Sequence, residues 1–165
     1  MTALGRDVNL SRWNLVERYL GGNKKILDWG CGNGSFLRGS RNGFEIHGYD
    51  VNPFGRFNNA GLYGQSWDGV TLWDVIEHME DPYGFIKGLS TKYLFILTPD
   101  VGGSPNRIEE WKHFRPDEHQ HYFSVDSMTK MLERAGFGVR EINRGEAGLR
   151  DTVHPEYLVT FVANR

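Results

Sequence analysis

The stretch Ile26–Leu37 constrains the fold more than any other part of the chain, because it joins an apolar run to regularly spaced glycines. The run up to Asp28 reads as a short buried strand, and three glycines at every second position follow it, ending at Gly34. Glycines leave the backbone unshielded by side chains, so a ligand can approach closely. The stretch therefore predicts a strand, a ligand-binding turn and a short helix over residues 35–41.

Two common glycine-rich motifs do not fit this turn. A dinucleotide site needs Gly-x-Gly-x-x-Gly, but here the third glycine, Gly34, comes one residue early. A phosphate-binding P-loop ends in Gly-Lys-Ser/Thr, which is absent. Asp28, at the end of the strand, is unsuited to a pyrophosphate and suits a ligand that carries positive charge.

A second strand, residues 45–50, ends in an acid, Asp50. This residue stands about 20 positions beyond the glycine turn, the interval at which such folds place a carboxylate on a ribose. The alternative is that Asp50 begins a turn with Asn52 and Pro53, which are good turn residues. Spacing and position favour the ligand role.

Length and composition predict one domain, residues 1–165, with residues 1–9 as a flexible arm. The net charge of −2 gives no strong nucleic-acid signal. A single cysteine, Cys31, excludes an internal disulfide, which fits a reducing compartment. Neither a secretory signal nor a membrane-spanning run is present, so we expect a cytoplasmic protein without a membrane partner.

The order of motifs resembles that of class I S-adenosylmethionine-dependent methyltransferases. Asp-x-Gly-x-Gly-x-Gly is followed by the strand-end acid and then by Asp74-Val-Ile-Glu-His78, which is similar to the branch that includes the ubiquinone-biosynthesis O-methyltransferases. The resemblance spans residues from about 10 to 165. It implies an α/β, Rossmann-like, doubly wound sheet of seven mostly parallel strands with an antiparallel last strand, in a single compact domain.

Residues 62–64 are expected to form the third of those strands, and residues 70–73 the fourth. The residues just after the third strand wrap the adenine ring in the resembling family, and Trp67 stands there. It could stack on a base, but a place in the core is an equally good reading.

The resemblance also implies S-adenosylmethionine as cofactor and S-adenosylhomocysteine as product. The residues that would contact this cofactor are Asp28, Gly30, Cys31, Gly32, Gly34, Asp50, Val51, Trp67, Trp73 and Asp74.

Three histidines are candidate bases for the acceptor: His78, His119 and His121. An unperturbed imidazole titrates near pH ~6.5, so each can accept a proton at neutral pH. A divalent cation held by Asp74, Glu77 and His78 is the second mechanism. The metal mechanism is not favoured, because the acid-x-x-Glu-His sequence pattern also occurs in methyltransferases that are not metal enzymes.

The predicted function is transfer of a methyl group to a hydroxyl or amine of a small-molecule acceptor. The alternative is a non-catalytic module on the same fold, which binds the cofactor or its product, or a partner protein. Neither the acceptor nor the oligomeric state is indicated by the sequence.

Overall fold

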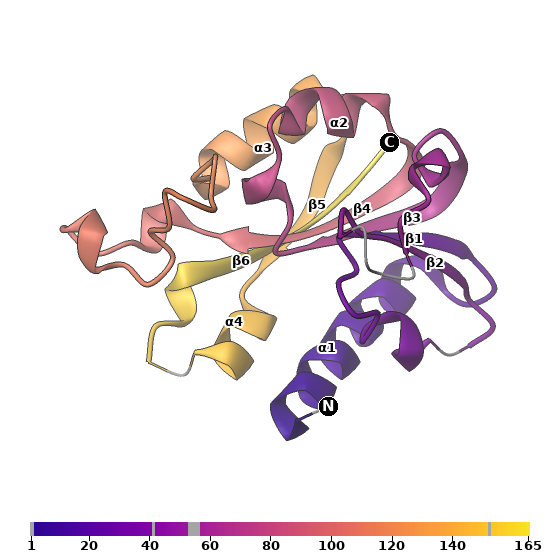
Figure 1. Ribbon diagram of the computed structural model, residues 1–165, viewed down its shortest axis with the longest axis horizontal. Coiled ribbons are helices and arrows are strands. Elements are labelled where there is room, and N and C mark those ends of the chain that lie inside the picture. Colours follow the sequence, from indigo (N-terminus) through magenta and orange to yellow (C-terminus); the bar gives the residue numbers. More distant parts are fainter. Residues whose placement is uncertain (1, 41, 53–56, 152) are drawn as a thin grey trace.

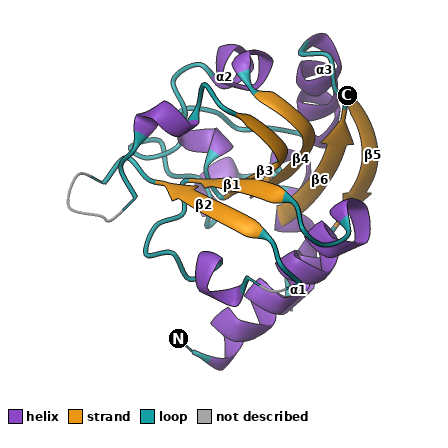
Figure 2. Cartoon of the chain, turned by 90° about the vertical axis from the view of Figure 1, so that its right-hand side faces the viewer, coloured by secondary structure: helices purple, strands orange, loops and turns teal. Residues whose placement is uncertain are grey.

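Six strands form one mixed sheet in the computed structural model, which describes residues 2–40, 42–52, 57–151 and 153–165. The order across the sheet is β2-β1-β3-β4-β6-β5 (Figure 2). The first four strands in this order are parallel, whereas β6 runs antiparallel between β4 and β5, as expected for the last strand. The strands are β1 (Lys25–Trp29), β2 (Glu45–Tyr49), β3 (Ser66–Trp73), β4 (Ser90–Pro99), β5 (Gly138–Asn143) and β6 (Leu158–Asn164).

Helices cover both faces of this sheet. α1 and α4 lie on one face and α2 and α3 on the other (Figure 1). No helix among the described residues combines the length and the apolar character that crossing a bilayer requires. The helices are α1 (Ala3–Leu20), α2 (Pro82–Gly88), α3 (Val125–Arg134) and α4 (Gly145–Arg150).

Each face of the sheet has its own hydrophobic core. Apolar side chains of β4 alternate between the two, with Phe95 and Leu97 facing α1 and Leu94 and Ile96 facing α2 and α3. Such a continuous apolar run is typical of a strand that is covered on both sides. Trp13 of α1 anchors one core, where its ring stacks on Phe36 and its Nε1 donates to the Phe36 carbonyl.

The α1 helix begins at Ala3, so the prediction of a flexible arm over residues 1–9 is wrong for the residues that the structure describes. Thr2 caps the helix by accepting a hydrogen bond from the Gly5 amide. Val8 and Asn9 are already buried, because this first part of the helix packs on the protein. Met1 lies outside the described residues.

Two further expectations about local structure are wrong. Residues 62–64 do not form a strand: a 3-10 turn, Ala60–Leu62, lies there, so the described sheet has six strands rather than seven. Residues 35–40 do not form an α-helix either, since turns lead into a single 3-10 turn, Leu37–Gly39. Arg41, the last residue of that expected helix, is not among the described residues.

The strand order places a ligand crevice at the end of β1. This strand pairs with β2 on one side and β3 on the other, so the direction of winding reverses there. Open parallel sheets bind ligands at the carboxyl ends of the strands that flank such a reversal. The turn that carries the three glycines follows β1 directly and therefore lies at this point.

Replacing Val8 by alanine tests whether the start of α1 is part of the fold. We expect Val8→Ala to lower the free energy of unfolding by about 1–2 kcal/mol, because it removes two buried carbon atoms and leaves a gap. Leu10→Ala is the control, since Leu10 is half exposed and its loss should change stability by less than about 0.5 kcal/mol. Urea unfolding of both variants provides the measurement, and a silent Val8→Ala would show that this segment does not pack on the fold.

Candidate active site

The glycine turn is held by its own backbone. The amides of Gly30 and Cys31 both donate to the Tyr49 carbonyl at the end of β2, at 2.7 and 3.0 Å. The Gly34 amide donates to the Cys31 carbonyl at 2.9 Å. These three amides are therefore already paired, and what the turn offers to a ligand is an open surface rather than a set of free donors.

The glycines serve different purposes within the turn. All three have a positive φ, the region that side chains rarely adopt. A Cβ at Gly30 would also lie 2.3 Å from Cγ2 of Val75, so this glycine permits close packing of the turn on the segment after β3. A Cβ at Gly32 would meet no atom within 4 Å, which leaves the space above this residue open.

Asp50 faces this open part of the turn. Its Oδ2 accepts a hydrogen bond from the Gly32 amide at 2.7 Å, and its Oδ1 accepts one from the Asn52 amide at 2.9 Å. The carboxylate stays partly exposed and has lone pairs to spare, because a carboxylate can accept about four hydrogen bonds. Asp50 therefore combines a structural contact to the turn with free capacity for a ligand.

Asp28 lies behind the turn, at the end of β1. It is almost completely buried, and its Oδ1 accepts a hydrogen bond of 2.6 Å from the Thr71 hydroxyl. Burial raises the pKa of Asp28 to about 6, and the hydrogen bond from Thr71 and the charge of Arg12 oppose that rise. Positive charge on a ligand would favour the ionised carboxylate further.

A cavity of about 450 Å³ opens beside the turn, at the carboxyl ends of β1 and β2. Its walls are mostly apolar, with the Trp29 and Tyr49 rings stacked at a centroid distance of 3.9 Å and Phe85 of α2 beside Trp29. Asp50 and His78 provide polar groups at this cavity, and the exposed Val51 lies on its rim. Such a cavity suits a flat, mostly apolar group that carries hydroxyls.

His78 follows β3 in the 3-10 turn Ile76–His78 and projects into this cavity. Its Nδ1 lies 2.9 Å from the Glu118 carbonyl oxygen, which can only accept. Nδ1 therefore carries the proton in the neutral ring, and Nε2 is left as the basic nitrogen. His78 is thus oriented to receive a proton.

Glu77 and His119 complete a cluster with His78. One ligand atom from each of the three lies within 4.8 Å of the other two, and the two imidazole rings meet edge to face. Burial raises the pKa of Glu77 to about 8, and burial together with the neighbouring His78 lowers the pKa of His119. Nδ1 of His119 is buried without a hydrogen-bond partner, which leaves it available to a cation or a substrate.

His121 lies near this cluster without being part of it. Its backbone amide, like that of Gln120, donates to the Glu77 carbonyl, and this contact brings the long loop after β4 back to the site. The His121 ring stacks on Phe123, and its Nε2 is buried without a partner. The structure therefore groups two of the three predicted histidines, His78 and His119.

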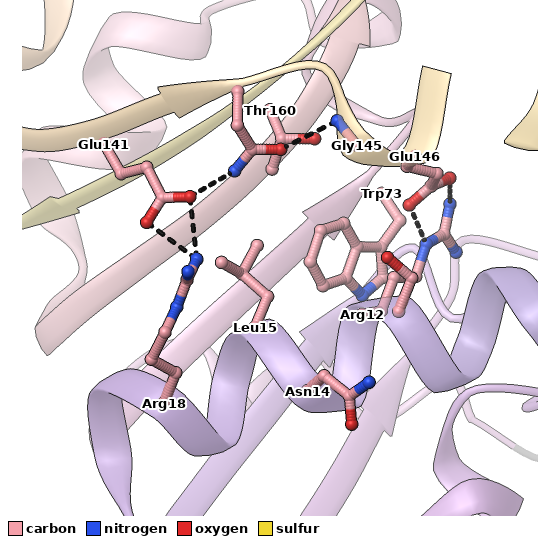
Figure 3. Close-up of a pocket in the computed structure, with 11 residues that line it drawn as sticks. Arg12, Asn14, Leu15, Arg18, Trp73, Glu141, Gly145, Glu146 and Thr160 are labelled. Carbon is pink, nitrogen blue, oxygen red and sulfur yellow. Dashed lines mark hydrogen bonds and ion pairs between the residues drawn. The ribbon is translucent and has the colours of Figure 1, made fainter. Parts of the chain in front are cut away.

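Asp74 is turned toward two arginines. Its carboxylate lies 2.7 Å from Arg150 of α4 and 3.4 Å from Arg12 of α1, and the same two arginines also pair with the buried Glu146. Figure 3 shows Arg12 reaching Glu146 beside the Trp73 ring. Asp74 is therefore absent from the cluster that Glu77 and His78 form, in contrast to the predicted metal set. Its positive φ of 58° marks a strained position of the kind found at functional sites.

Comparison with known proteins was decisive for the family. A family model described as a methyltransferase domain matches residues 10–142. The chain belongs to this methyltransferase domain family. No curated protein sequence matches the chain significantly.

Solved structures agree on the fold of this methyltransferase domain. A SAM-dependent methyltransferase from Archaeoglobus fulgidus is 19% identical over 98% of this chain and 94% of that one, with a TM-score of 0.69. Magnesium protoporphyrin IX methyltransferase from Synechocystis, solved with bound SAH, is 17% identical over 98% and 83%, with a TM-score of 0.61. A putative methyltransferase of Haloferax volcanii in complex with the activator Trm112 is 13% identical over 99% and 98%, with a TM-score of 0.66.

The prediction that Trp67 contacts the cofactor is wrong. β3 begins at Ser66, not at Val70, so Trp67 lies at the amino end of that strand, far along it from the turn at its other end. Its ring is buried in the core, and its Nε1 donates to the Leu62 carbonyl at 3.0 Å. The single hydrogen-bond donor of the Trp67 side chain is therefore used within the fold.

Trp73 and Cys31 are buried rather than open to the cavity beside Asp50. Trp73 faces α1, under the guanidinium of Arg12, and lines a separate cavity of about 390 Å³ (Figure 3). The Cys31 thiol points toward Gly48, and burial, with the charges of Asp28 and Asp50, raises its pKa to about 12. The thiol stays protonated and acts as a small packing group.

Sequence reasoning missed the aromatic wall of the cavity. Trp29 stands inside the glycine motif and Tyr49 directly before Asp50, so each lies at the end of a strand that was correctly placed. Their position at the carboxyl ends of two neighbouring parallel strands could have identified them as residues that line the ligand cavity. Arg12, Arg150 and Glu146 were missed too, and no local pattern marks them, since they come from helices at opposite ends of the chain.

The raised pKa of Glu77 predicts a specific pH dependence of stability. The unfolded chain loses this proton near pH ~4.3, whereas the folded protein keeps it up to about pH 8. The folded state therefore binds more protons between these values, and the free energy of unfolding falls as pH rises, by up to about 1.4 kcal/mol per pH unit. Glu77→Gln abolishes this contribution, so the variant should gain stability relative to the parent between pH 5 and pH 8.

Urea unfolding at both pH values measures the difference, with Glu80→Gln as the control because Glu80 is exposed nearby. An equal effect of Glu77→Gln at pH 5 and pH 8 would contradict the raised pKa.

Proposed function

We propose that this domain is an S-adenosylmethionine-dependent methyltransferase that acts on a hydroxyl or amine of a small-molecule acceptor. The observation that carries the proposal is the position of Asp50, which faces the open side of the glycine turn next to an aromatic cavity. The cavity suits an adenine ring and the carboxylate suits the two ribose hydroxyls. Open space above Gly32 leaves room for the link between ribose and sulfur.

The electrostatics behind the turn support a cationic ligand. Asp28 is buried and becomes easier to ionise when positive charge comes near, so the ammonium group of the cofactor and this carboxylate favour each other. The bound S-adenosylhomocysteine of the Synechocystis neighbour supports the same cofactor for this fold. When bound, S-adenosylmethionine supplies an electrophilic methyl carbon and a sulfur that leaves as a thioether.

The residues of the chain then have to orient the acceptor and remove its proton. His78 is the group that we assign as general base, because Nε2 is its basic nitrogen and the side chain lines the cavity beside Asp50. Glu77 holds the backbone of the loop after β4 in place through its carbonyl, and His119 packs against the His78 ring. Similarity of the Asp74-x-x-Glu77-His78 segment to the ubiquinone-biosynthesis O-methyltransferases supports a hydroxyl as acceptor.

The cofactor site is tested by calorimetric titration with S-adenosylhomocysteine. Asp50→Asn should weaken binding about 10- to 100-fold, because hydrogen bonds to a charged acceptor contribute about 1.5–3 kcal/mol. Gly32→Val should weaken it at least as much, since its side chain would fill the open space at a strained φ. Asp68→Asn is the matched control. Asp68 also accepts a hydrogen bond from a backbone amide, that of Lys25, but it lies at the amino ends of the strands, away from the glycine turn. Full affinity in both site variants would refute the proposal.

The base is tested with cofactor labelled on its methyl group and a pool of small metabolites. His78→Gln should lower methyl transfer about 10²- to 10⁴-fold, the usual contribution of a general base, while affinity for S-adenosylhomocysteine stays unchanged. His154→Gln, an exposed histidine far along the chain, should leave transfer intact. Absence of any transfer by the parent protein, with product binding retained, would favour the non-catalytic binding module instead.

A divalent cation is the alternative to a free base. The donor set of Glu77, His78 and His119 fits a transition metal, and the unpartnered Nδ1 of His119 agrees with such a role. The cation would acidify a substrate hydroxyl. We expect the transfer measured above to be indifferent to a chelator, as a free base requires. Loss of transfer with a chelator and recovery with Mn²⁺ or Mg²⁺ would overturn that expectation and favour the metal.

A further inference from the structure

A smaller cavity, separate from the two already described, lies between α4 and the loop after β4. It measures about 230 Å³, and its lining is Lys112, His113, Arg115, Arg150 and Leu158. Four of these five residues have side chains with cationic or potentially cationic groups. Its size is below the roughly 300–1,000 Å³ of sites for whole ligands, so it suits one substituent of a larger molecule.

The carboxylates that pair with these cations do not line the cavity. Lys112 pairs with Asp151, Arg115 with Glu118, and Arg150 with Asp74 and Glu146. Because none of these carboxylates is among the lining residues, the wall of the cavity carries the cationic members of ion pairs that are neutral as a whole. An anion inside it would meet donors and no carboxylate.

His113, which also lines the cavity, has one ring nitrogen without a partner. Its Nε2 is buried and has no hydrogen-bond partner. Burial, with the charges of Lys112 and Arg150, lowers the pKa of His113 to about 4, so the ring is neutral and can carry its single proton on Nε2. The wall of the cavity therefore includes a neutral ring, which brings no negative charge to it.

The cavity lies on the acceptor side of the proposed active site. Arg150 bonds to Asp74, the first residue after β3, and Leu158 pairs with Pro99, the last residue of β4. The cavity therefore lies at the carboxyl ends of the strands, as the glycine turn does. The loop that carries Lys112 and Arg115 also delivers His119 to His78.

From this arrangement we infer that the acceptor carries an anionic group, a carboxylate or a phosphoryl group, which binds in the cavity between Lys112, Arg115 and Arg150. This inference rests on the proposed function, because it names the acceptor class of that active site. Guanidinium groups match the geometry of both oxyanions, and the exposed ends of Lys112 and Arg115 can adjust to the rest of the acceptor.

The test uses inorganic phosphate and acetate as probes, added separately to the isotopically labelled protein at constant ionic strength. We expect one or both to shift the backbone amide signals of Lys112 and Arg115 in NMR spectra in a saturable way, whereas glycerol should not. The stronger of the two probes identifies the oxyanion. The double variant Lys112→Gln/Arg115→Gln should bind that probe at least tenfold more weakly.

Arg107→Gln is the control, because Arg107 is an exposed arginine of the same loop that does not line the cavity. It should bind the probes like the parent. Saturation by neither anion, or equal binding by the parent and the double variant, would overturn the inference. Titration with S-adenosylhomocysteine distinguishes a failure of this inference from a failure of the proposed function. The parent and the double variant should bind S-adenosylhomocysteine equally well, whatever the result with the anions.

Discussion

The hydrogen bond from the Gly32 amide to Asp50 is the contact on which the site depends. It joins the turn after β1 to the end of β2 and fixes the carboxylate beside Gly32, the glycine of the turn whose Cβ position is open. The Tyr49 carbonyl, which accepts from Gly30 and Cys31, supports the same junction one residue earlier. Two neighbouring strand ends are thereby held in a single geometry, and the aromatic cavity between them keeps its shape.

How much of this could be read from the sequence depends on how local each feature is. The positions of Asp28, the glycines and Asp50 at the ends of β1 and β2 could be predicted, because each follows from the strand beside which it stands. Trp67 was misplaced because the start of β3 is set by pairing with β4, where Trp67 lies opposite Thr91. The early start of α1 was missed for a similar reason: burial of Val8 comes from tertiary packing and not from a pattern in residues 3–9.

The cluster around His78 shows the same limit more sharply. The segment Asp74-Val-Ile-Glu77-His78 suggested that its own acids act together, yet the backbone turns Asp74 away with a positive φ. His119, 41 residues beyond His78, takes the place of Asp74, because the amides of Gln120 and His121 bond to the Glu77 carbonyl. The spacing within this segment therefore indicated two members of the cluster, Glu77 and His78, but suggested Asp74 where the structure has His119.

Asp74 and Glu77 belong to two groups of residues, which differ in the partners that their carboxyl groups have. Glu146 and Asp74 each lie in ion pairs with the same two arginines, Arg12 and Arg150. Burial raises the pKa of Glu77 to about 8, and the hydrogen bonds from Thr98 and the backbone oppose that rise only in part. The first group ties α1 to α4 and holds the strained Asp74, whereas in the second burial raises the pKa of Glu77 and lowers that of His119. Asp74 and Glu77 are only three residues apart along the chain, so the segment after β3 carries an ion-paired carboxylate and a buried acid with a raised pKa side by side.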